Sequence, residues 1–178
     1  ADVEELATKP ALVDEVEVGI HLHWALPDAL THGQRPQGQD RITFPPVPNR
    51  WLVTRIHSSN RDPQNPVLQV KSWVVESDFI TAAAAPGATL VPFPTPTGQQ
   101  FYQALGRAVE YEAWQEELGG TSYFKAVMGH SLTAIGYGES TFAAYYPNCR
   151  SVFGFYDDLK SLTDYDPENN RLTYLVSG

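Results

Sequence analysis

Runs of alternating apolar and polar residues constrain the fold of this chain more than any other feature. Residues 16–24 carry apolar side chains at alternate positions, namely Val16, Val18, Ile20, Leu22 and Trp24. This period of two is typical of a β-strand with one buried face. Further strands are predicted at 50–57, 67–76, 152–156 and 171–176. The turn at 60–66, which contains Asp62-Pro63 and Asn65-Pro66, joins the first two of these into a hairpin.

The remaining segments predict a β-rich domain with many turns. The chain has 178 residues, with 14 prolines and 13 glycines, and this length is typical of one domain that buries a proper core. We therefore expect a single domain over 1–178, mostly β with short helices (α+β), with an antiparallel or mixed sheet and a sandwich-like arrangement. Smaller expected elements are an extended connector at 44–48, a Pro/Ala-rich surface strap at 81–98, a turn or one helical turn at 25–30, a helix-and-strand mixture at 99–117, short strands at 126–128 and 132–135, and a helix at 139–146.

Two histidines lie on one face of the first predicted strand. His21 and His23 are two residues apart, so their Cα atoms lie about 6.5–7 Å apart on the same side. His57 ends the strand at 50–57, and pairing of the two strands would add a third imidazole. Three histidines with an open water position are a catalytic zinc site. Glu17, Asp28 and His32 are further candidate ligands.

Two interpretations of these histidines remain open. One is a zinc-dependent hydratase or hydrolase with His21, His23 and His57 as metal ligands and zinc as cofactor. The other is a pair of ordinary polar residues on a half-exposed strand, with no cofactor and no catalytic residue. We expect the second, because two ligands do not complete a zinc site.

Charge and hydropathy exclude several classes of partner. Asp and Glu outnumber Lys and Arg by 21 to 12, which gives a formal charge of −9. Binding to nucleic acid or to an anionic membrane surface depends on clustered basic residues, so neither partner is expected. No stretch approaches the roughly 18 apolar residues of a membrane-spanning helix, and we expect a soluble protein.

The run His21-Leu22-His23-Trp24 resembles the zinc-binding strand of the α-class carbonic anhydrases. In that family such a run supplies two of three histidine ligands, which implies a metal role for His21 and His23. The resemblance covers four residues. The third ligand of that family lies in an E-x-H-like setting, whereas His57 follows Arg55-Ile56, which puts the third ligand in doubt.

A longer resemblance covers residues 19–30, 44–53, 142–153 and 172–178. These segments are similar to the N-terminal region of large bacterial multidomain proteins, a family with no assigned reaction and no established ligand set. The resemblance implies a module of a larger bacterial protein and carries over no functional residues. Aromatic residues make up 12% of the chain, a composition seen in contact surfaces. We therefore predict a non-catalytic interaction or structural module that binds other domains of the parent protein, or a protein or carbohydrate ligand, through aromatic surfaces.

The predicted strand at 171–176 carries one further expectation. Its apolar part ends two residues before the last residue, without the polar segment that usually follows a final strand. An unpaired strand of this kind invites pairing with other chains. We therefore expect the chain to rely on neighbouring sequence and to self-associate less when extended.

Overall fold

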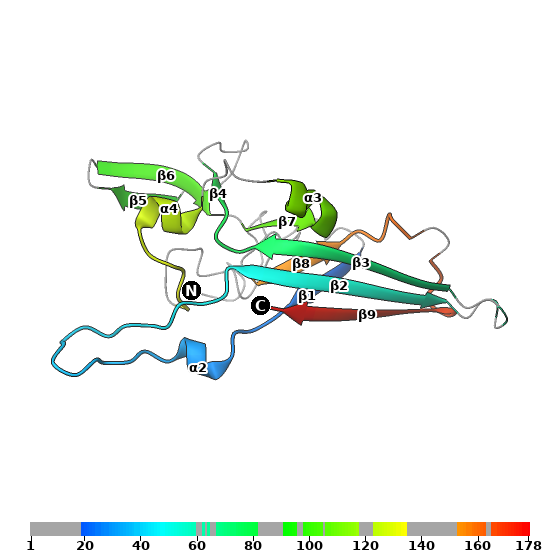
Figure 1. Cartoon of the computed structure of the whole chain (residues 1–178), viewed down its shortest axis with the longest axis horizontal. Coiled ribbons are helices and arrows are strands. Elements are labelled where there is room, and N and C mark those ends of the chain that lie inside the picture. Colours follow the sequence, from blue (N-terminus) through cyan, green and yellow to red (C-terminus); the bar gives the residue numbers. More distant parts are fainter. Residues whose placement is uncertain are drawn as a thin grey trace, which may run out of the picture.

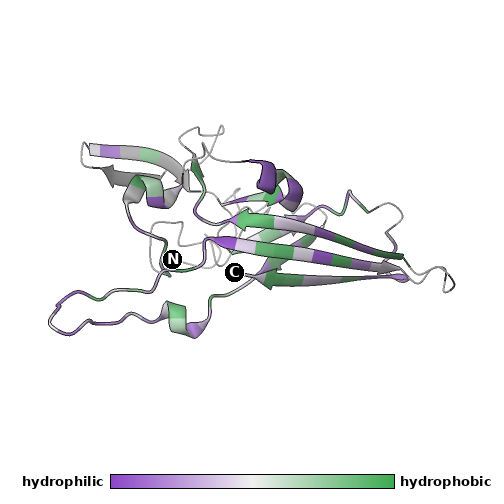
Figure 2. Ribbon diagram, viewed as in Figure 1, coloured by the Kyte–Doolittle hydropathy of each residue, from purple (hydrophilic) through white to green (hydrophobic). Residues whose placement is uncertain are grey.

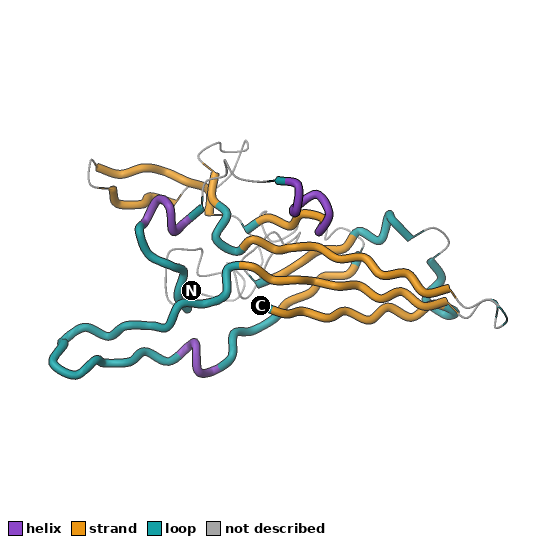
Figure 3. Tube along the Cα trace, viewed as in Figure 1, coloured by secondary structure: helices purple, strands orange, loops and turns teal. Residues whose placement is uncertain are grey.

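Three antiparallel sheets and three short helices make up the described part of the chain (Figures 1 and 3). The computed structural model describes residues 19–59, 62, 64, 67–81, 91–95, 98–104, 106–117, 123–134, 153–162 and 165–178. The predicted class, mostly β with short helices and antiparallel sheets, is confirmed. The predicted helix at 139–146 lies outside the described residues.

The largest sheet has the order β7-β3-β2-β9. Its strands are β2 (Arg50–Ser59), β3 (Val67–Glu76), β7 (Arg107–Glu110) and β9 (Asn170–Ser177). The hairpin predicted from the sequence forms, with β2 and β3 paired along their full ten residues. The other side of β2 pairs with β9, which comes from the opposite end of the chain. Both sides of β2 are therefore occupied.

One face of this sheet, the inner face, carries the core. Trp51 and Val53 of β2 lie beside Val75 and Trp73 of β3, and all four are buried. A second, two-stranded sheet packs over them, formed by β1 (Ile20–His23) and β8 (Gly154–Asp157). Phe155 of β8 completes the cluster, and partly buried residues surround it: Leu22, Trp24, Leu26, Phe153 and Tyr174. Two packed layers thus produce the expected sandwich-like arrangement.

The alternation in β2 explains why this face is buried. Val53 is fully buried, and burying a side chain of this size contributes about 1.5–3 kcal/mol. Leu52, on the opposite side of the same strand, is 40% exposed. A shift of the strand by one residue would exchange the two faces, so the core fixes the register.

A third sheet has the order β4-β6-β5, with β4 at Ile80–Thr81, β5 at Val91–Thr95 and β6 at Gly98–Ala104. It lies apart from the four-stranded sheet in Figure 1. β5 falls within the segment expected to be a surface strap. It carries Pro92 and Pro94. Because β5 is an edge strand, it occupies a position in the sheet where proline is tolerated.

The helices are α2 (Asp28–Thr31), α3 (Tyr111–Glu116) and α4 (Phe124–Met128). Of the turn or helical turn expected at 25–30, the helical alternative forms as α2, which starts at Asp28 and extends to Thr31, and the mixture of strand and helix at 99–117 is confirmed. The strand predicted at 126–128 is wrong, because these residues form the end of α4. Gly129, with φ of 75°, ends this helix in the left-handed conformation that favours glycine. None of the described helices is long and apolar enough to cross a membrane.

Candidate functional site

The structure places the three candidate metal ligands in two different sheets. β1 pairs with β8, which sets His21 opposite Tyr156, and the two rings lie 4.7 Å apart between centroids. His57 lies on β2, opposite Gln69 and Leu172. The predicted pairing of the two histidine strands is therefore wrong, because β3 and β9 already occupy both edges of β2.

His57 is buried on the inner face rather than exposed on a polar one. Its Nδ1 lies 3.4 Å from Gln69 Oε1, and its buried Nε2 has no hydrogen-bond partner among the residues that the structure describes. His32 instead caps α2, where its Nδ1 lies 2.7 Å from the Asp28 carbonyl oxygen. Glu17 is outside the described residues. Across the described ranges, no group of three or more His, Cys, Asp or Glu side chains is arranged to hold a metal ion.

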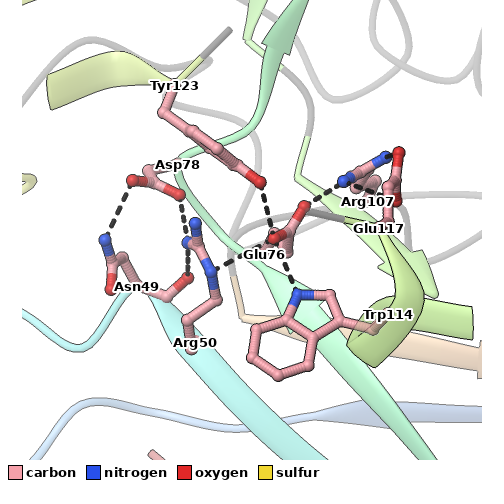
Figure 4. Close-up of polar contacts among 8 residues, drawn as sticks. All are labelled: Asn49, Arg50, Glu76, Asp78, Arg107, Trp114, Glu117 and Tyr123. Carbon is pink, nitrogen blue, oxygen red and sulfur yellow. Dashed lines mark hydrogen bonds and ion pairs between the residues drawn. The ribbon is translucent and has the colours of Figure 1, made fainter. Parts of the chain in front are cut away.

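The most connected polar group in the described chain surrounds Glu76, at the end of β3 (Figure 4). Strand register places Arg50 of β2 on one side of Glu76 and Arg107 of β7 on the other. These three residues and the side chains bound to them form the Glu76 cluster, which consists of Asn49, Arg50, Glu76, Asp78, Arg107, Trp114, Glu117 and Tyr123.

Glu76 is 1% exposed, and donors surround both of its oxygens. Its Oε1 accepts hydrogen bonds from Trp114 Nε1 and from the Tyr123 hydroxyl, each at 2.9 Å, and lies 3.2 Å from Arg50 Nε. Its Oε2 accepts a hydrogen bond from Arg107 Nε at 2.5 Å. A buried carboxylate is stable only with such partners. The site therefore holds Glu76 as an anion.

The arginines are also paired on their outer sides. Arg50 bonds to Asp78, which accepts a second hydrogen bond from Asn49 at 2.9 Å. Arg107 reaches Glu117 at 3.1 Å. Arg50 lies over the Tyr123 ring, 4.6 Å from its centroid, a cation–π contact. Every charge in the Glu76 cluster thus has a partner of the opposite sign.

The chemistry of the Glu76 cluster is that of a structural clamp. Burial alone would raise the pKa of Glu76, but hydrogen bonds from Trp114, Arg107 and Tyr123 and the charge of Arg50 lower it below the usual 4.5. A general base needs a pKa nearer the working pH, so Glu76 is a poor proton acceptor. The cluster fastens α3 and Tyr123 to the end of the sheet.

A second buried ion pair joins the two packed layers. Arg55 Nη1 of β2 donates to both carboxylate oxygens of Asp157 on β8, at 2.9 and 2.7 Å. Arg55 Nη2 donates to Ser161 Oγ, and the Tyr174 hydroxyl donates to Asp157 Oδ2. Burial and the neighbouring Asp157 carboxylate raise the pKa of Tyr174 well above its usual range. This pair sits at the polar border of the core.

An open depression of about 440 Å³ lies beside this ion pair, lined by Arg55, Gln69, Val70, Lys71, Glu112 and Ser161. Arg55 is paired with Asp157, and Lys71 is paired with Glu110. Its cations are therefore already neutralised. Glu112 adds a carboxylate to the lining, so the depression does not favour an anionic ligand.

Hydrophobic and hydrophilic residues are interspersed along β2, β3 and β9 (Figure 2), and the apolar residues that lie on the outer face of the four-stranded sheet include several exposed ones. Leu68 is 69% exposed, Val70 61% and Leu175 56%. Register places Val70 beside Ile56, and Leu175 beside Thr54. We call this group the outer patch, which consists of Leu52, Ile56, Leu68, Val70 and Leu175. The Glu76 cluster covers the other end of the same face.

No protein-family model, no curated protein and no solved structure matches this chain.

Proposed function

We propose that this chain is a non-catalytic interaction module of a larger bacterial protein, and that the outer patch is the surface with which it binds another domain of that protein. The observation that carries this proposal is the exposure of Leu68, Val70 and Leu175 on one sheet face. Large apolar side chains grouped in this way are typical of protein contact surfaces.

The charge of the outer face supports the same conclusion. The chain as a whole has a formal charge of −9. On the open part of the outer face, however, the polar residues between the apolar ones are the uncharged Ser58, Ser72 and Thr173. Arg171 is the charged residue at its end. The centre of a protein interface is depleted of charge in the same way.

The tryptophans favour a protein ligand over a carbohydrate. Trp51 and Trp73 are buried in the core, and Trp24 packs against them. Trp114 bonds to Glu76. All four tryptophans are thus engaged inside the fold, and the side chains of the outer patch are aliphatic. A carbohydrate platform of exposed tryptophan rings is not available.

Cysteine labelling tests the proposal directly. In a background with Cys149→Ser, Val70→Cys is labelled with a maleimide in the isolated chain and in the complete native polypeptide. We expect labelling at position 70 to slow strongly in the complete polypeptide, because another domain covers the outer patch. Leu52→Cys is expected to behave in the same way.

Lys160→Cys is the matched control, because the Lys160 side chain is 84% exposed and its neighbour Ser161 bonds to Arg55 on the inner side of the sheet. Its labelling rate should be equal in both proteins. Equal labelling rates at position 70 in the isolated chain and the complete polypeptide would contradict the proposal.

A further inference from the structure

We propose that two copies of this chain pair through β9, as antiparallel strands related by a two-fold axis at Tyr174. The pairing joins two four-stranded sheets into one continuous sheet. It uses the edge of β9 rather than the outer patch, so it goes beyond the function proposed above and is tested separately from it.

One hydrogen bond shows which β9 residues direct their backbone N–H and C=O groups toward the open edge of the sheet. Ser77 N donates to Asn49 O at 3.0 Å, and this pair continues the β2–β3 register. Hydrogen-bonded pairs alternate along an antiparallel strand. The backbone groups of odd-numbered β2 residues therefore form hydrogen bonds with β3, and those of even-numbered β2 residues form hydrogen bonds with β9. Since Thr54 faces Leu175, odd-numbered residues of β9 bond to β2. Leu172, Tyr174 and Val176 direct their N–H and C=O groups outward.

This edge lacks the features that protect other strands. β9 contains no proline, and its one charged residue is Arg171, near its start. By contrast, the edge strand β5 carries Pro92 and Pro94. In the part of the chain that is described, β9 has β2 as its one neighbour. A long edge strand with one charged residue and no proline pairs readily with another strand.

A second copy fits this edge because β9 is self-complementary about Tyr174. Leu172 then faces Val176 of the second copy, and Tyr174 faces its counterpart, each pair exchanging two hydrogen bonds. Thr173 faces Leu175, and Arg171 faces Ser177. No pair brings like charges together, which would oppose pairing.

Disulfide cross-linking tests both the dimer and its register. With Cys149→Ser as background, Thr173→Cys and Leu175→Cys chains are mixed and oxidised. Positions 173 and 175 form a non-hydrogen-bonded pair, with Cα atoms about 4.5 Å apart, within the range for a disulfide. We expect the mixture to form covalent dimers and each variant alone to form few. A mixture that cross-links no better than the separate variants would overturn the proposal.

Sedimentation of matched variants gives an independent test. Val176→Pro removes an outward N–H without touching the bonds to β2, and we expect a folded monomer. Val176→Thr keeps that N–H and should remain a dimer. Rising salt should tighten the dimer, because each copy carries a charge of −9 and salt screens the repulsion. A native chain that is monomeric at every concentration, or a dimeric Val176→Pro variant, would overturn the proposal.

Discussion

Arg55 and Asp157, 102 positions apart in the sequence, form an ion pair in which each side chain is 3% exposed. The pair connects the four-stranded sheet with β8 at the border of the core. Removing one member leaves the other as an unpaired buried charge.

Arg55→Met should therefore lower the free energy of unfolding by about 3–5 kcal/mol. The double variant Arg55→Met/Asp157→Asn should lose less, because Asn neutralises the orphaned charge and can still accept the Tyr174 bond. Urea denaturation measures both. Lys71→Met is the control, because it removes the more exposed pair with Glu110 and should cost about 0–1 kcal/mol. Equal losses for Arg55→Met and Lys71→Met would argue against this account.

The lowered pKa of Glu76 predicts a loss of stability in acid. As the pH falls below 4.5, the unfolded chain binds a proton before the folded one does. The stabilisation from Glu76 is thus complete above the unfolded pKa and is lost as the pH falls through the folded pKa. Glu76→Gln cannot titrate, so it should flatten the acid part of the stability–pH curve. Tyr123→Phe removes one donor to Glu76 and should flatten it partly; an unchanged slope in Glu76→Gln would contradict the prediction.

Gly19 lies too close to β8 for any larger residue. A Cβ atom there would collide with the Asp157 carbonyl oxygen and lie 2.6 Å from Tyr156 Cε2. Gly19→Ala should therefore lower the free energy of unfolding by about 1–3 kcal/mol, the usual cost of overpacking. The thermal midpoint is a convenient measurement. His23→Ala, at an exposed position of β1, should change it little.

The histidines of β1 give a test of the metal hypothesis. We expect the purified chain to hold no stoichiometric zinc, and His21→Gln/His23→Gln to change stability by within about 1 kcal/mol. Elemental analysis and urea denaturation are the measurements. One zinc per chain, lost in the double variant and weakened by His57→Gln, would instead support a zinc enzyme.

The sequence predicts the three long strands of the four-stranded sheet, because alternation reports directly which side of a strand is buried. The strand predicted at 67–76 matches β3, and those at 50–57 and 171–176 lie within β2 and β9. Alternation does not report which strands become neighbours. The pairing of β1 with β8, which separates His21 from His57, depends on contacts between distant parts of the chain.

The Glu76 cluster could not be read from the sequence for the same reason. Arg50, Glu76 and Arg107 are far apart along the chain and meet only through strand register. The helix α4 was missed because Ala126–Met128 is a short apolar run, which fits a strand or a buried helix equally well. The following Gly129 was the available signal for a helix end.

The position of β2 between β3 and β9 also has a consequence for synthesis in the cell. The β2–β3 hairpin is local and can form as soon as residue 76 has left the ribosome. The other edge of β2 has to wait for β9, more than 90 residues later in the chain, at about 5–20 residues per second. During that interval the nascent hairpin exposes the Trp51 side chain, together with the backbone N–H and C=O groups of the even-numbered β2 residues that later bond to β9.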